Sequence, residues 1–159
     1  MFDRMGISTL LVVSGLVCGC GGKERVTVSA SVHEVQLSVE EQTLGTFLAG
    51  EFQLLVTLGV NAPRSTTVTL ESFSLVRASD QTELVAPLPL ATPTSPFELG
   101  PGDEETLTLT LDANDPIGQG LRDDLCAEPV QIRGTVTDTE SEERSTPVQS
   151  GSVTVGGCS

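Results

Sequence analysis

The chain has 159 residues and a formal charge of −14, because 22 Asp and Glu side chains stand against 8 Lys and Arg. It contains five Phe and one His, but neither Trp nor Tyr. Nucleic-acid binding needs clustered cations for the phosphates and, for single strands, rings that stack on bases, so the composition excludes that class. The length fits one domain with one hydrophobic core.

The first 17 residues have the composition of an export signal. One Arg lies close to the amino terminus, and residues 7–17 form an apolar run that only Ser, Thr and Gly interrupt. This run is too short for a spanning helix, which needs about 20 residues. It suits the apolar region of a signal peptide.

The end of this run has the spacing of a lipid-attachment motif. Val17 lies three positions before Cys20, and the small residue Gly19 lies directly before it. This pattern resembles the lipobox of bacterial lipoproteins. The resemblance implies cleavage before Cys20, a diacylglyceryl group on its sulfur and N-acylation, with fatty acids such as palmitate. An ordinary secretory leader whose cysteines occur by chance is the alternative.

The lipobox reading divides the chain into a signal peptide (residues 1–19), a lipidated tether (20–25) and a folded domain (26–159). Two or three acyl chains hold a protein persistently on a lipid bilayer. Gly21 follows the cysteine where retention in the inner membrane favours Asp, so we expect the outer membrane of a bacterial cell envelope. Removing residues 1–19 takes away one Asp and one Arg, so the folded part carries the whole charge of −14.

The rest of the chain alternates apolar and polar residues with a period of two. Successive side chains of a strand point to opposite faces, so this pattern predicts half-buried strands. The clearest case is residues 106–111, with three Leu on one face and three Thr on the other. Further strands are predicted at residues 26–32, 35–39, 52–60, 65–70, 73–75, 130–136 and 153–155.

Short strands separated by turn residues are typical of an all-β domain. We predict a single immunoglobulin-like, two-sheet antiparallel β-sandwich, with a closed barrel as the alternative. Residues 40–51 form a connection of uncertain conformation, and residues 118–126 have the spacing of a helical turn. The segment from Leu54 to Pro63, followed by a Thr-rich strand, resembles the water-stress β-sandwich domains of late-embryogenesis-abundant proteins.

Two cysteines remain besides Cys20 after cleavage. Exported proteins meet an oxidising environment, so Cys126 and Cys158 are predicted to form a disulfide. The bond would fix the last strand, at residues 151–155, to the segment before Val130. A metal site built on two thiols is the alternative, but the chain lacks the further His and Cys ligands that such a site requires.

The acidic loops of residues 112–116 and 122–128 are the candidate metal ligands. Their oxygen side chains are of the kind that Ca²⁺ prefers, but the spacing matches no calcium loop, and turn formation is the competing explanation. The weak calcium candidates are Asp112, Asn114, Asp115, Asp123, Asp124 and Glu128.

No catalytic motif is present, and His33 lies in an alternating strand where an outward-facing His is ordinary. We therefore expect a protein that is not an enzyme and has no cofactor. Its role would be that of a lipid-anchored structural or protein-interaction module. A calcium-dependent adhesion or ligand-binding domain is the alternative. Strand 106–111 is a candidate for pairing with a strand of a protein partner.

Overall fold

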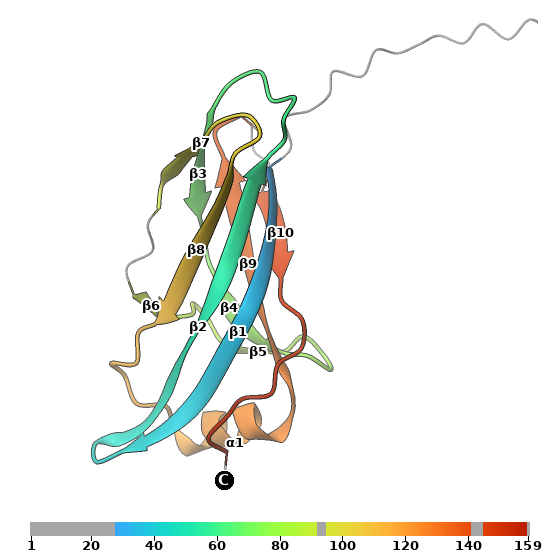
Figure 1. Cartoon of the computed structure of the whole chain (residues 1–159). Helices are drawn as coiled ribbons and strands as arrows, with labels where there is room; N and C mark the ends of the chain where they lie inside the picture. The colour runs from blue at the N-terminus through green and yellow to red at the C-terminus, as the bar shows by residue number, and fades with distance from the viewer. Residues whose placement is uncertain (1–27, 92–94, 141–144, 159) are drawn as a thin grey trace, which may run out of the picture.

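Two antiparallel sheets pack face to face in the computed structural model, which describes residues 28–91, 95–140 and 145–158 (Figure 1). The first sheet has the order β1-β2-β8-β6, and the second has the order β5-β4-β9-β3-β7, with β10 paired to β9. The predicted all-β, two-sheet antiparallel sandwich is confirmed. The elements are β1 Val28–Gln42, β2 Gly45–Leu58, β3 Thr66–Leu70, β4 Ser74–Arg77, β5 Glu83–Val85, β6 Leu90–Ala91, β7 Phe97–Leu99, β8 Glu104–Leu111, α1 Gln119–Ala127, β9 Val130–Asp138 and β10 Ser145–Gln149.

Alternation along the strands builds the core. In β8 the three Leu side chains are buried and the three Thr side chains that alternate with them are exposed, as the sequence predicts. The most deeply buried large side chains come from both sheets and from α1, and they include Phe52, Leu54, Phe73, Leu75, Leu125 and Ile132. Burial of this apolar surface between the sheets is the main force that holds the sandwich together.

A bulge in β1 joins two segments that the sequence pattern separates. The register of β1 against β2 shifts between His33 and Gln36, and Glu34 has a φ of 47°. The bulge adds one residue to β1 and so shifts the alternation of its side chains by one position. Both Val32 and Leu37 therefore face the core, although an odd number of positions separates them. Residues 40–51 are not a separate connection, because β1 and β2 continue through them as one long hairpin.

A second bulge interrupts the strand that pairs with β9. In the β3–β9 register Leu70 lies opposite Val136, and in the β4–β9 register Ser74 lies opposite Arg133, so β3 and β4 have one residue more than β9 between these pairs. The extra length places Phe73 in the core, where its ring lies 5.7 Å from that of Phe52. The ring occupies the space in which a side chain at Gly134 would lie.

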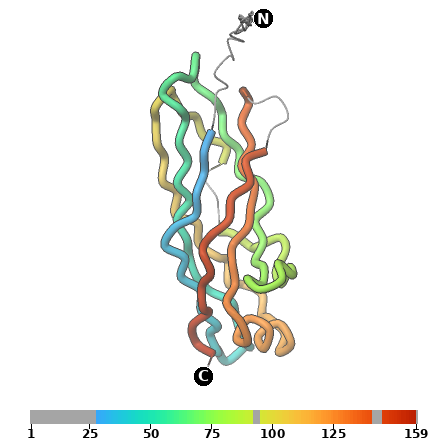
Figure 2. The backbone as a smooth tube through the Cα atoms, turned by 90° about the vertical axis from the view of Figure 1, so that its right-hand side faces the viewer, coloured from blue at the N-terminus to red at the C-terminus, as the bar shows by residue number. Residues whose placement is uncertain are grey.

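Segments that pass from one sheet to the other cover both sides of the sandwich. On one side, β6 pairs with β8 of the first sheet, and the following strand β7 pairs with β3 of the second. On the other side, the chain leaves β10 in the second sheet and reaches β1 of the first, where Gly156 pairs with Ser38 (Figure 2). Among the described residues, no helix combines the length and the hydropathy that crossing a bilayer demands.

Candidate functional site

The end of the sandwich that carries α1 contains the disulfide. Helix α1 follows Gly118, buries Leu125 in the core and places Cys126 within bonding distance of Cys158. The two Cα atoms are 5.5 Å apart and the cysteines are separated by 32 residues. The helix agrees with the helical turn that the sequence predicts at residues 118–126. The disulfide joins Cys126 to Cys158, the pair that the sequence predicts.

The segment before Cys158 crosses between the sheets through a few backbone contacts. Val153 and Val130 exchange two hydrogen bonds of 2.8 Å. The backbone N–H of Gly156 then donates to Leu37 at 2.8 Å, and that of Val39 donates to Gly156 at 2.9 Å. The expected strand at residues 151–155 is therefore wrong. The segment makes isolated bridges, because it changes sheets before any ladder can form.

The calcium candidates do not all lie in loops, because the segment predicted as an acidic loop at residues 122–128 is mostly helical: Asp123 and Asp124 belong to α1, and Glu128 follows its last residue. Several of the candidates have protein partners. Asp112 accepts a hydrogen bond from Asn114, Glu128 accepts one from Ser79, and Asp124 forms an ion pair with Arg77 at 3.0 Å. Within residues 28–91, 95–140 and 145–158, no group of three or more His, Cys, Asp or Glu side chains is arranged to hold a metal ion. The fold thus does not gather Asp112, Asn114, Asp115, Asp123, Asp124 and Glu128 around one point.

Calcium is accordingly expected to leave the melting temperature of the purified chain unchanged, beyond the effect of an equal ionic strength of magnesium. Asp112, Asp124 and Glu128 would have to break their hydrogen bonds or ion pairs within the protein in order to bind Ca²⁺. A carboxylate that binds alone holds Ca²⁺ weakly, since the ion prefers six to eight oxygen ligands. Thermal melts with calcium, magnesium and a chelator check this. A rise specific to calcium that disappears in Asp115→Ala would show that the loops do form a site.

Arg77 connects the turn between β4 and β5 to the helix. Its guanidinium contacts Asp124 of α1 and also Asp80 at 3.3 Å. The backbone N–H of Thr82 donates to Asp80, and this hydrogen bond, with a smaller contribution from Arg77, holds the pKa of Asp80 below its usual value. A lowered pKa means that Asp80 contributes stability above its unfolded-state pKa, and that this is lost as the pH falls through the folded-state pKa.

His33 lies exposed on the outer face of the first sheet, as the alternation predicts. Its Nε2 lies 2.7 Å from the hydroxyl of Ser31, the next outward-facing residue of the strand. In the described part of the chain, no carboxylate hydrogen-bonds to this imidazole. The pair therefore lacks the third group that orients a catalytic His.

β8, the candidate strand for pairing with a partner, has one edge that the chain itself covers in part. β2 pairs with it from Glu104 to Thr110. On the other edge, the described residues of β6 pair only with Thr110 and Leu111. Glu104 and Glu105 lie within β8, where charged side chains oppose unwanted strand pairing.

Comparisons with known proteins do not place the chain in a family. Its sequence matches no protein-family model and no curated protein. Among solved structures, the chain is similar to self-complemented MyfA, the major subunit of Myf fimbriae from Yersinia enterocolitica, in complex with galactose. The identity is 16%, the match covers 82% of this chain and 98% of that chain, and the TM-score of 0.44 is too low to transfer any property.

The resemblances to bacterial lipoproteins and to water-stress β-sandwich domains therefore stay predictions. The first rests on residues 17–20, which lie outside the described residues together with the whole predicted leader and tether. The second rests on a segment that spans the end of β2 and the loop after it.

Proposed function

We propose that this chain is a bacterial cell-envelope lipoprotein, anchored through acyl chains on Cys20, that presents a non-catalytic, acidic β-sandwich to a protein partner. The order of features along the sequence supports the anchor, because an apolar run too short to span a bilayer ends at a lipobox-like cysteine. The outer membrane is the proposed location, on the strength of Gly21.

The place where β1 begins supports one orientation of the folded domain relative to the bilayer. Val28 lies eight residues after Cys20. A fully extended chain of eight residues is about 26–29 Å long, which limits how far Val28 can lie from the anchor. Val28 pairs with Leu58, at the end of the sandwich opposite α1 and the described carboxyl end (Figures 1 and 2). In the anchored protein the loop after Leu58 would face the bilayer, and α1 and the tip of the β1–β2 hairpin would face away.

The charge distribution supports a partner with a basic surface. The four arginines of the described residues are each paired with a carboxylate, while most carboxylates have no cationic neighbour within ion-pair distance. Such a surface repels anionic lipid and steers positively charged proteins toward it. The partner is therefore a protein with a basic surface.

Two exposed apolar residues at opposite ends allow a test of this orientation. Leu44, at the hairpin tip, is 87% exposed, and Val60, in the loop after β2, is 77% exposed. A photo-reactive amino acid at position 60 is expected to crosslink to lipid in living cells, and one at position 44 to protein. Lipid adducts at position 44 alone would reverse the orientation, and the absence of lipid adducts at both would contradict the anchor.

The anchor itself is tested by mass spectrometry of the membrane-purified chain. Diacylglyceryl modification of Cys20 is expected, and Cys20→Ser should release the protein from the membrane fraction. Cys18→Ser is the matched control, because it alters the neighbouring cysteine and leaves the attachment site. An unmodified chain that begins at Met1 would contradict the proposal.

The acidic surface predicts that salt stabilises the fold. At low ionic strength the excess carboxylates repel one another over a Debye length that shrinks to about 10 Å at 0.1 M salt. The melting temperature should therefore rise with NaCl, by about 2–4 °C for each kcal/mol gained. KCl should act equally, since screening depends on ionic strength. A fall in melting temperature would mean that the five ion pairs outweigh the repulsion.

A further inference from the structure

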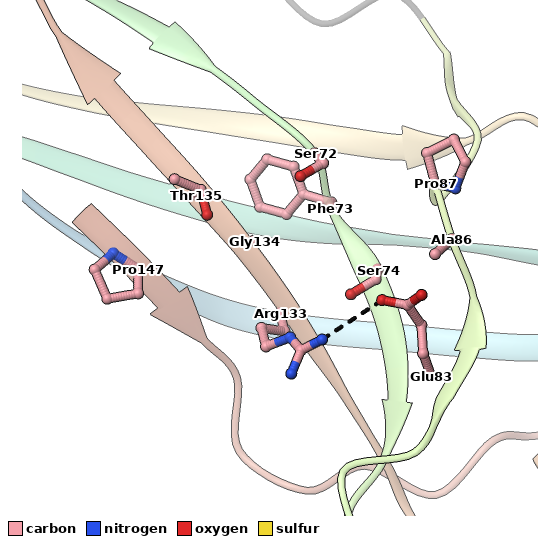
Figure 3. Close-up of a pocket in the computed structure, with 10 residues that line it drawn as sticks. All are labelled: Ser72, Phe73, Ser74, Glu83, Ala86, Pro87, Arg133, Gly134, Thr135 and Pro147. Carbon is pink, nitrogen blue, oxygen red and sulfur yellow. Dashed lines mark hydrogen bonds and ion pairs between the residues drawn. The ribbon is translucent and has the colours of Figure 1, made fainter. Parts of the chain in front are cut away.

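A depression on the outer face of the second sheet has the features of a ligand site. Its volume is about 560 Å³, within the range of small-molecule sites, and residues from β4, β5, β9 and β10 line it (Figure 3). It lies where the β3–β4 strand is interrupted. The neighbouring strands do not cover this interruption, because within the described residues β7 pairs only with β3 and β5 only with β4.

Ser74 forms part of its floor and lacks a partner. The residue is only 8% exposed, and its hydroxyl makes no hydrogen bond with any described residue. Figure 3 shows this hydroxyl directed toward the side chains of Arg133 and Glu83. Among the described residues, the buried side-chain atom that lacks a partner is Nε of Arg122 and not the Ser74 hydroxyl, so this hydroxyl is accessible from the depression. A molecule bound there could therefore hydrogen-bond to it in place of water.

Opposite charges stand beside this hydroxyl. Arg133 and Glu83 approach to 3.5 Å, and their side chains are 46% and 51% exposed. The other arginine ion pairs of the described residues measure between 2.7 and 3.3 Å. Charge-assisted hydrogen bonds normally measure about 2.7–2.9 Å, so the contact between Arg133 and Glu83 is loose. Both side chains are about half exposed, so each can also reach a ligand group of the opposite charge.

Apolar surface borders the charged pair on both sides. Pro147 of β10 stands on one side and Pro87, after β5, on the other (Figure 3). Pro147 lies opposite Thr135 in the β9–β10 register, so both point to the outer face. The walls therefore combine hydrocarbon surface with hydroxyl groups around one cation and one anion.

We propose that this depression binds a small zwitterion, namely a free α-amino acid with an apolar side chain. The ligand carboxylate would accept hydrogen bonds from the Arg133 guanidinium and the Ser74 hydroxyl, and the ammonium would contact Glu83. The apolar side chain would lie against Pro87 or Pro147. A simple anion fits less well, because the protein charge of −14 repels it. A zwitterion has no net charge and satisfies both groups of the pair.

NMR titration of the full-length chain in detergent micelles tests this proposal with L-leucine as the probe. Saturable shifts of the Ser74 and Arg133 amide signals are expected. Leucinamide, which lacks the carboxylate, and N-acetyl-leucine, which lacks the ammonium, should each bind at least about tenfold more weakly, since each loses one charged contact. Absence of saturable shifts with L-leucine, or equal binding of the blocked compounds or of glycerol, would overturn the assignment.

Three substitutions locate the site. Ser74→Ala, Arg133→Gln and Glu83→Gln should each weaken leucine binding, by about five- to tenfold for the loss of one hydrogen bond or charge. Arg64→Gln is the matched control, because Arg64 is also an exposed, ion-paired arginine but lies outside the depression. If Ser74→Ala and Arg133→Gln bind as the unaltered chain does, the site is elsewhere and the proposal fails.

Stability separates a binding role of Ser74 from a structural one. Its hydroxyl makes no hydrogen bond with any residue that the structure describes, so Ser74→Ala should keep or raise the melting temperature while it weakens leucine binding. A structural hydroxyl would behave oppositely, and Ser74→Ala would then lower the melting temperature and leave leucine binding unchanged. That second pattern would overturn the proposal.

Discussion

Replacing Phe73 by alanine is expected to lower the free energy of unfolding by about 3–5 kcal/mol, the range typical of a buried Phe→Ala substitution. The side chain is 2% exposed and contacts the ring of Phe52, and it also fills the place above Gly134. Its loss would leave a cavity between the sheets at the second bulge. Equilibrium denaturation of the purified chain measures the change.

Gly134→Ala should also destabilise the fold, because it adds an atom to a filled space, whereas Phe73→Ala leaves a space empty. An added Cβ would lie 2.4 and 2.5 Å from two ring carbons of Phe73, so the ring has to move into a filled core. Overpacking of this kind costs about 1–3 kcal/mol. Gly151→Ala is the matched control, because a Cβ at that position meets nothing within 4 Å.

Coupling between the two positions decides whether the contact is the cause. In the double variant with alanine at both positions, the new methyl group enters the space that the ring has left, so the loss should be smaller than the sum of the single losses. Strictly additive effects would show that Gly134 is required for its backbone conformation and not to accommodate the ring. Phe73→Leu provides a milder variant if Phe73→Ala is too unstable to measure.

Both bulges were visible in the sequence as changes of phase. The core-facing residues occupy even positions up to Val32 and odd positions from Leu37, and a strand cannot change phase without an extra residue. The same change separates Val68 from Phe73. The alternation thus predicts which faces are buried. The change of phase predicts separate strands in both places, which is wrong within β1 and agrees with the division between β3 and β4.

The short strands could not be predicted from local pattern. β6 has two residues, β5 and β7 have three each, and β10 contains Pro147. Segments of this length carry no usable period, and proline lowers strand propensity except at an edge. Their pairing depends on the sheet edges that the longer strands provide.

The disulfide could be predicted from the sequence, whereas the depression at Ser74 could not. The disulfide could be predicted by elimination, because few cysteines remain after the leader. The depression at Ser74 could not, because its groups come from four separate strands and their neighbours, and a single serine in an alternating strand carries no signal of its burial. Only the register of β4 against β9 brings Ser74 beside Arg133.

Removing the disulfide by Cys126→Ala and Cys158→Ala together is expected to lower the free energy of unfolding by about 3–4 kcal/mol. The crosslink closes a loop between cysteines 32 residues apart, and the chain-entropy model gives this magnitude for such a loop. The effect should be largest at the carboxyl end, because few backbone contacts besides the disulfide hold residues 151–158. Hydrogen exchange at the amides of Val39 and Gly156 should become faster than at those of β2 and β9.

Gly157→Ala separates loop closure from docking of the terminal segment. Gly157 has a φ of 72°, and an added Cβ would lie 2.1 Å from the carbonyl oxygen of Val39, so alanine cannot occupy this position without displacing the segment. With the disulfide intact, this variant should speed exchange at Val39 and cost less stability than the loss of both cysteines. If removal of the disulfide changes neither stability nor exchange at Val39 and Gly156, the hydrogen bonds to β1 and the burial of Val155 suffice to hold the segment.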